Sequence, residues 1–445
     1  MKKLLIPVLL VFISSVSAAQ FGNIIDRAKQ KAKDKVNQKV DQKMDKAIGG
    51  AVDTVDNAVS GKNKSTKPNK KDEPVADQNN NNNEAADANK TENPSFKSYS
   101  KFDFVPGEKI IAAEDFGQDA VGDFPDKWNT NGNGEIVTTN TMKGKFLMTQ
   151  KDVVFYPEWI KDLPDNFTLE FDLASTEKFS FYSGYFAVGV TSSTTIGTSF
   201  REFARFGNGR IENGGGFEVG FHPENAGGGQ GLTHFFSSNN QLEVVKNEAD
   251  QDKFADKIKN AVHISIWRQK NRVRVYMDDK KVWDLPKAIA EGLLLKSIYF
   301  RNDGNNSNAD AYYLGNLKVA VGAADTRNKL ITEGKFISHG ILFDVNSDKI
   351  KPESYGALKD IANVLSENAD VKIKIVGHTD ADGDDAANMA LSKRRAEAVK
   401  NTLSKDFTID ETRIQTDGKG ESQPIDVNTT AVGKANNRRV EFIKL

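Results

Sequence analysis

An aspartate and an arginine near the C-terminus stand where they could act together on a ligand. Asp380 follows an alternating apolar run at 371–376, and Arg395 falls on the helix expected over 387–403. On that helix Arg395 lies within the arc formed by the apolar residues. Because a guanidinium is rarely buried without a partner, two interpretations stay open. Either Arg395 forms an internal ion pair, with Asp380 for example, or it lines the floor of a ligand pocket.

A second acidic pair could in principle hydrolyse glycosidic bonds. Glu170 and Asp172 lie two residues apart on a predicted strand, so their side chains point to the same face. The stretch starts like the catalytic strand of β-glucanases, but Ala174 and Ser175 stand where a third carboxylate is needed. We therefore expect an acidic pair on an exposed strand face and no enzyme. A glycoside hydrolase is the alternative.

Metal and cofactor sites are not predicted. The acidic loop at 301–311 could hold calcium, but it lacks the spacing of a hand-type loop, and a polar turn is expected. The five histidines form no ligand pair at helical or strand spacing. Cysteine is absent, which excludes disulfides, thiolate metal sites and a lipid-accepting Cys.

Length and charge restrict the class of protein. A chain of 445 residues suggests two or three domains, and 61 basic against 62 acidic residues give no case for nucleic acid as a partner. Residues 1–19 have a charged start, an apolar stretch and a small-residue cleavage site, which is typical of a secretory signal peptide. No later stretch has 18 consecutive apolar residues, so no transmembrane helix is predicted. We expect an exported protein.

Two segments without a core follow the signal peptide. Residues 20–60 have apolar residues at helical spacing with lysine and aspartate on the other faces. They predict an amphipathic helix, either simply solvated or resting on a membrane surface or a partner helix, so membrane association is peripheral at most. Residues 61–100 are rich in Asn, Lys, Asp and Pro and predict a disordered linker.

Residues 101–321 predict an all-β sandwich. Short alternating runs separated by Gly/Asn/Asp loops occur at 167–173, 185–191, 216–222, 262–269, 272–279, 297–303 and 312–320. These runs are shorter and more charged than the strands of a transmembrane barrel, which is the competing interpretation. The region resembles the concanavalin A-like or laminin-G-like jelly rolls. That resemblance implies a module that binds carbohydrate or protein, and it names no ligand.

Residues 330–445 predict a small α/β domain. A strand over 340–346, a helix over 352–368, a strand over 371–376, the helix over 387–403 and two final strands give a β-α-β-α-β order. The motif GHTDADGDDAANMALSKRRAEAV, which starts at Gly377, is similar to that of the OmpA-like peptidoglycan-binding domain, and the closing NRRVEF fits as well. The resemblance covers about 110 residues.

The resemblance implies a ligand and the residues that bind it. In the family an aspartate and an arginine bind the diaminopimelate end of the peptidoglycan stem peptide, and here these are Asp380 and Arg395. A carboxylate beside a planar guanidinium suits a group that carries both an ammonium and a carboxylate. The other residues expected around the ligand are Thr379, Asn388, Asp344, Asn346 and Arg438.

The predicted function follows from these parts. We expect a cell-envelope protein of the periplasm or outer membrane, without enzymatic activity, metal or cofactor. Its C-terminal domain would bind peptidoglycan non-covalently and tether a sandwich that engages a glycan or an envelope protein. In the alternative, the sandwich is a glycoside hydrolase anchored to the wall.

Overall fold

The computed structural model describes residues 102–204, 214–240, 242–256, 260–303, 311–322 and 328–445. The predicted signal peptide, amphipathic helix and linker at 1–100 lie outside these residues, as does most of the loop at 301–311. All described residues belong to one compact unit. Among the described helices, none is both long and apolar enough to cross a membrane.

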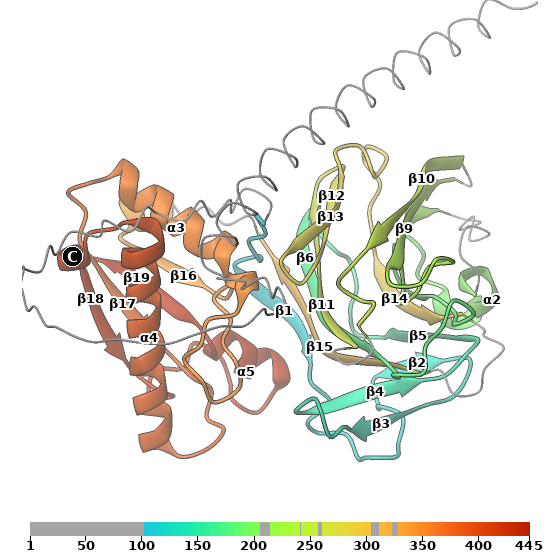
Figure 1. Ribbon diagram of the computed structural model, residues 1–445, viewed down its shortest axis with the longest axis horizontal. Helices are drawn as coiled ribbons and strands as arrows, with labels where there is room; N and C mark the ends of the chain where they lie inside the picture. Colours follow the sequence, from blue (N-terminus) through green and yellow to red (C-terminus); the bar gives the residue numbers. More distant parts are fainter. Residues whose placement is uncertain (1–101, 205–213, 241, 257–259, 304–310, 323–327) are drawn as a thin grey trace, which may run out of the picture. The chain divides into compact units, whose positions relative to one another are not determined.

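Two antiparallel sheets form the first part of the described chain (Figure 1). One sheet has the order β13-β12-β11-β6-β15-β4-β3, and β1 also pairs with β15. Its strands are β1 (Lys109–Glu114), β3 (Gly134–Thr138), β4 (Lys145–Thr149), β6 (Asn166–Ser175), β11 (Ala261–Gln269), β12 (Arg272–Met277), β13 (Lys280–Leu285) and β15 (Tyr312–Val321). We call this sheet A.

The second sheet, sheet B, has the order β10-β9-β8-β7-β14-β5-β2. Its strands are β2 (Trp128–Thr130), β5 (Val153–Pro157), β7 (Phe186–Thr191), β8 (Gly215–His222), β9 (Gly231–Asn239), β10 (Leu242–Gln251) and β14 (Ser297–Asn302). A 3₁₀ turn η1 (Ile196–Thr198) and a short helix α2 (Phe200–Phe203) follow β7. Residues 154, 196, 203 and 299 form a small apolar cluster with them.

The sandwich core comes from the alternation of side chains along both sheets. On β6, Leu169, Phe171 and Leu173 are fully buried, and on β8, Phe217 and Phe221 face them from the other sheet within one apolar cluster. Aromatic and β-branched residues at every second position suit a pleated surface with one face buried. The prediction of an all-β sandwich is confirmed, and all seven predicted runs form strands.

The second part is a four-stranded sheet with helices. The order of strands is β16-β19-β17-β18, with β17 and β18 parallel and the other pairs antiparallel. The strands are β16 (Lys335–Ser338), β17 (Ile373–Gly377), β18 (Ile414–Gly418) and β19 (Val440–Lys444). The helices are α3 (Tyr355–Glu367), α4 (Asp385–Phe407) and α5 (Ala431–Asn437), with the short helical segments η2 (Asn328–Glu333), η3 (Pro352–Ser354) and η4 (Glu411–Arg413).

Helices α3 and α4 share one apolar core with this sheet. Leu358 and Ile361 of α3, Val399 and Leu403 of α4, and Ile375 of β17 are fully buried in one cluster. Helix α4 contacts both β17 and β18. The prediction of a small α/β domain after the sandwich is confirmed.

One predicted strand of this domain is wrong. Residues 340–346 form no strand, and only a single bridge joins Phe343 to Ile350. The first strand is instead β16, which pairs with β19. The reason lies in a tight turn: Asn346 has φ +56°, and the amide of Ser347 donates to the carbonyl of Asp344. A chain that turns back on itself cannot continue as an extended strand.

Candidate functional site

The loop between β17 and α4 carries Thr379 and Asp380. Strand β17 ends at Gly377, and the amide of Thr379 donates to the carbonyl of Gly420, 2.9 Å away, just beyond the end of the parallel neighbour β18. Helix α4 then starts at an N-cap, because the side chain of Asp384 accepts a hydrogen bond from the amide of Ala387. Both ends of the loop are therefore fixed by the fold.

A glycine at the end of β17 brings α4 close to this loop. A Cβ atom at Gly377 would lie 2.2 Å from the carbonyl oxygen of Ser392, in the backbone of α4. Any larger residue would push the helix away from the strand. The helix residues on this side, including Asn388 and Arg395, are thereby held next to the loop.

Asp380 is a buried carboxylate with a cationic neighbour. Its side chain forms an ion pair with Arg438, with 2.5 Å between Nη1 and Oδ2, and its other oxygen accepts from the amide of Asp382. Arg438 is the C-cap residue of α5, and its side chain is partly exposed. The carboxylate is therefore oriented from two sides.

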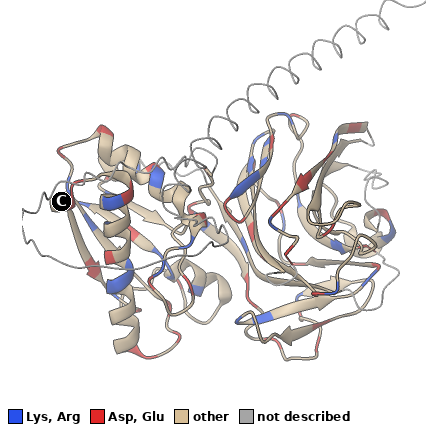
Figure 2. Cartoon of the chain, in the orientation of Figure 1, with Lys and Arg blue, Asp and Glu red and all other residues tan. Residues whose placement is uncertain are grey.

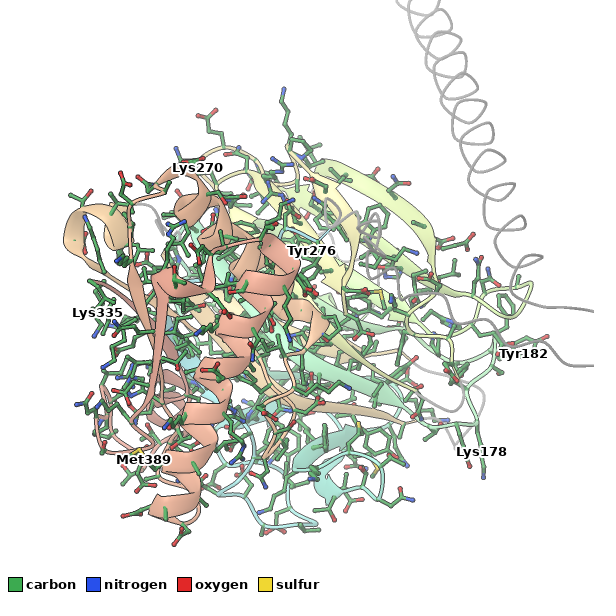
Figure 3. All side chains as sticks on the ribbon, turned by 60° about the vertical axis from the view of Figure 1, so that its left-hand side comes forward. Lys178, Tyr182, Lys270, Tyr276, Lys335 and Met389 are labelled. Atoms are coloured by element: carbon green, nitrogen blue, oxygen red, sulfur yellow. The ribbon has the colours of Figure 1, made fainter. Side chains whose placement is uncertain are left out.

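Arg395 enters the same region from α4. Its guanidinium lies over the ring of Phe343, 4.8 Å from the centroid, and its Nε donates to the carbonyl of Ser347. Met389, on the same helix, is by contrast exposed (Figure 3). Burial lowers the pKa of Arg395, and the charge of Asp380 opposes this shift.

The contacts of Arg395 distinguish between an internal ion pair and a place at the floor of a ligand pocket. Within the described part of the chain, no carboxylate oxygen lies within 4.0 Å of the Arg395 guanidinium. The internal ion pair of Asp380 is formed with Arg438 instead. The Arg395 guanidinium thus retains donors for a further acceptor, although its stem is half-buried.

Two polar side chains complete this side of the site. The side-chain amide of Asn388 donates to the backbone carbonyls of Asp380 and Asp382. It also donates to the carboxylate of Glu421, at 2.6 Å, and these bonds hold the loop in place. Thr379 is 5% exposed, and its hydroxyl has no hydrogen-bond partner among the described residues. A buried hydroxyl without a partner costs free energy, which favours a polar ligand beside it.

A cavity of about 460 Å³ gathers most of the residues predicted from the sequence. Its lining includes Thr379, Asp380, Asn388, Arg395, Arg438 and Asn346. Asp344 does not line it, because the backbone of this residue closes the turn before Lys349 and its carboxylate lies 3.9 Å from Lys349 Nζ. Basic and acidic residues both occur along α4, so charge alone does not mark the site (Figure 2).

The sequence does not point to the other wall of this cavity. Asp172, His263, Asn316 and Lys318 of sheet A line it together with the C-terminal residues. No sequence pattern marks these four as neighbours of Asp380, since they come from three strands far away in the chain. In the sequence, Asp172 stands out only for its relation to Glu170.

The expected exposed position is wrong for Glu170, which is buried, while Asp172 is partly exposed. Glu170 is 2% exposed, and His263 lies between the two carboxylates, with Nδ1 2.6 Å from Asp172 and Nε2 3.5 Å from Glu170. Lys318 lies 3.3 Å from Glu170. The pairing brings together β6, β11 and β15, because His263 is opposite Asp172 and Lys318 opposite Glu170 in the sheet register. We call these four residues the sheet A charge cluster.

The pKa shifts of the cluster follow from its charges. Burial alone raises the pKa of Glu170, but Lys318 and His263 outweigh it and hold that pKa below its usual value. The pKa of Asp172 is lowered in the same way, burial being outweighed by His263 and Asn316. Burial lowers the pKa of His263, but the two carboxylates together raise it to about 10. At neutral pH the two carboxylates are therefore ionised and His263 is protonated.

Among the described residues, no group of three or more His, Asp or Glu side chains could hold a metal ion. The calcium prediction for 301–311 falls largely on residues that the structure does not describe.

The fold and the cavity define a small α/β binding domain whose site lies between the end of its central strand and its longest helix. A model of the OmpA family matches residues 342–438. The chain is 43% identical over 101 residues to "Outer membrane porin F" of Pseudomonas fluorescens, which covers 23% of this chain and 31% of that protein. It is 36% identical over 107 residues to "Putative lipoprotein YfiB" of Escherichia coli K12, covering 24% of this chain and 67% of that one.

Solved structures are similar over the same region. The crystal structure of the peptidoglycan-associated lipoprotein from Burkholderia pseudomallei shares 27% identity, with a TM-score of 0.22, and covers 24% of this chain and 88% of that chain. The chain belongs to the OmpA family through its C-terminal domain. It spans about a third of the length of the porin F relatives, and the family match does not extend into the sandwich.

Proposed function

We propose that the C-terminal domain binds peptidoglycan non-covalently at the diaminopimelate end of its stem peptide. The observation that carries the proposal is the state of Arg395: a half-buried guanidinium beside Asp380 with no carboxylate of its own among the described residues. A ligand carboxylate would satisfy it in a bidentate pair, and Asp380 would accept from the adjacent ammonium. Membership of the OmpA family supports the same ligand.

If the C-terminal domain binds the wall, the sandwich is held at the wall with it. The sandwich, as a concanavalin A-like jelly roll, would be a non-enzymatic module that engages a glycan or an envelope protein and is held at the wall. The protein would act in the periplasm, associated with the outer membrane, and the name "Outer membrane porin F" of one relative supports the membrane association. The alternative of an anchored glycoside hydrolase is weakened by the lowered pKa values of Glu170 and Asp172, since a general acid needs a raised pKa.

The test is sedimentation of the full mature chain with purified sacculi that contain diaminopimelate. The wild type should sediment with the wall, and free diaminopimelate should compete, whereas Nα-acetyl-lysine amide, whose free end has an ammonium but no carboxylate, should compete poorly. Arg395→Ala and Asp380→Ala should each weaken binding by about thirtyfold or more, since an unpaired desolvated charge costs about 2 kcal/mol at least.

The matched control is Arg394→Ala, which removes the same type of side chain from an exposed position one residue away. Binding of this variant should stay within about twofold of the wild type, because an exposed charge outside the site contributes little. Folded Asp380→Ala and Arg395→Ala proteins that sediment as fully as the wild type would refute the proposed site.

A further inference from the structure

The cavity that holds Asp380 and Arg395 has a second wall, which sheet A supplies. Asp172, Asn316 and Lys318 line the same cavity as Asp380 and Arg395. This wall is not part of the OmpA family match, which begins at residue 342. Its polar groups therefore belong to this chain's own combination of domains.

A β-bulge presents Asn316 to the cavity. In the pairing of β15 with β6, Gly315 lies opposite Asp172 and Lys318 opposite Glu170, so Asn316 and Leu317 share one partner position. Asn316 has φ +51°, a left-handed conformation that is uncommon outside glycine, and its side chain is exposed. Bulges often redirect a side chain beside a functional site.

Asp172 is held in a fixed orientation at this wall. Its Oδ2 accepts from Asn316 Nδ2 at 2.6 Å, and its Oδ1 is 2.6 Å from His263 Nδ1. The carboxylate is partly exposed, and Asp172 lines the cavity. Asp172 and Asn316 together offer acceptors and an amide to a ligand, which suits the N–H and C=O groups of a peptide backbone.

The wall is fixed next to the diaminopimelate site by hydrogen bonds. The side chain of Asn436 accepts from the amide of Ile110 and donates to its carbonyl, each at 3.3 Å. Ile110 also packs with Ala320 of β15 and Ala435 of α5 in a small apolar cluster. Asn436 is two residues before Arg438, which pairs with Asp380. The contact thus joins strand β1 directly to the segment that carries a residue of the site.

We propose that the peptidoglycan site is composite: Asp172 and Asn316 of the sandwich contact the peptide backbone of the stem, next to the diaminopimelate group held by Asp380 and Arg395. This inference rests on the proposed function. The sandwich then contributes to recognition of the stem peptide, so a ligand that consists of diaminopimelate alone would make none of its contacts.

The test compares two ligands on the full mature chain by calorimetry: free diaminopimelate, and a soluble disaccharide–tetrapeptide that contains diaminopimelate. Asn316→Gly is the main variant, because glycine accepts the positive φ while the amide is lost. Its affinity for the disaccharide–tetrapeptide should fall about threefold to tenfold, as expected for a lost hydrogen bond, and its affinity for free diaminopimelate should stay within about twofold. Asp172→Asn should show the same selective loss.

The control is Asn240→Gly, which also replaces a left-handed asparagine (φ +46°), in the turn between β9 and β10 of sheet B. It should affect neither ligand. Melting temperatures identify any variant that is not folded, and either of the two sheet A variants suffices for the test.

Folded sheet A variants that bind the disaccharide–tetrapeptide like the wild type would overturn the composite site, while loss of both ligands in Asp380→Ala would still support the proposed function. If Asp380→Ala keeps both ligands, the proposed function fails as well.

Discussion

Asp380 and Arg438 form an ion pair, with 2.5 Å between Oδ2 and Nη1, so the carboxylate proposed to bind an ammonium is oriented by a neighbouring guanidinium. The side chain of Arg438 is 45% exposed, whereas that of Asp380 is 11% exposed. The site therefore has two arginines with different tasks. In the proposed site, Arg395 would donate to a ligand carboxylate, and Arg438 would hold the carboxylate that accepts from the ammonium.

The first prediction concerns Arg438. Arg438→Ala should weaken sedimentation with diaminopimelate-containing sacculi by about tenfold, because Asp380 loses its orienting partner and the site loses a positive charge near the ligand carboxylate. Arg438→Lys should recover only part of the loss, since an ammonium keeps the charge without the planar fork. If Arg438→Ala binds the wall like the wild type, Arg438 has no part in the site.

The second prediction concerns Gly377. Gly377→Ala should lower the melting temperature of the full chain by several degrees, since its Cβ would lie 2.2 Å from the Ser392 carbonyl and α4 would have to shift. Wall binding of the folded fraction should weaken too, because the shift moves Arg395 relative to Asp380. Gly227→Ala is the control: its nearest atom would be a side-chain oxygen 3.6 Å away, at ordinary contact distance. Equal melting temperatures for the two variants would contradict this role of Gly377.

That Asp380 and Arg395 line one cavity could be predicted from the sequence because the signals are local. These signals are Gly377, the N-terminal half of α4 and the position of Arg395 on that helix, and all of them depend on short-range spacing. If residues 371–376 form a strand and 387–403 a helix, this spacing brings Asp380 and Arg395 together. The partner of Asp380 is less accessible. Arg438 lies 58 positions further along the chain, and no pattern distinguishes a ligand-binding arginine from one that holds the aspartate.

Two other sequence predictions are wrong because the structure depends on a turn and on strand pairing that local spacing does not show. The strand expected at 340–346 rests on alternation, but a left-handed Asn346 turns the chain there. The exposed position expected for the pair Glu170 and Asp172 is wrong for Glu170, because a strand pattern shows which side chains share a face and not what covers that face. His263 and Lys318 neutralise the pair from two neighbouring strands, and sheet register is not visible in a single sequence.

The third prediction is that the full chain does not hydrolyse β-glucans or peptidoglycan. Both carboxyl groups of the sheet A charge cluster have lowered pKa values, because Lys318 and His263 outweigh burial at Glu170, and His263 and Asn316 outweigh it at Asp172. Neither therefore carries a proton to donate near neutral pH. The measurement is release of reducing sugars over a range of pH. Turnover that is lost in Glu170→Gln would establish the hydrolase and overturn the non-enzymatic role of the sandwich.

The last prediction concerns the pH dependence of stability and its origin in His263. Because the folded pKa of His263 is raised to about 10, its stabilising contribution is fully present below the ordinary value near 6.5 and is lost as the pH rises through about 10. Glu170 and Asp172 have lowered pKa values, so their contributions are present above pH of about 4.5 and are lost on acidification. The contribution of the cluster should therefore be greatest between about pH 4.5 and 6.5.

Comparison of His263→Gln with the wild type isolates the contribution of His263 to the free energy of unfolding. The variant should be less stable than the wild type at pH 6 by about 3 kcal/mol, because two carboxylates lose the cation between them. The difference should shrink as the pH is raised from about 7 to 10, by at most about 1.4 kcal/mol for each pH unit, since only one proton is involved. Urea unfolding of the full chain at about pH 6, 8 and 10, followed by tryptophan fluorescence, measures both quantities. Parallel pH profiles for the two proteins would show that His263 is not the protonated centre of the cluster.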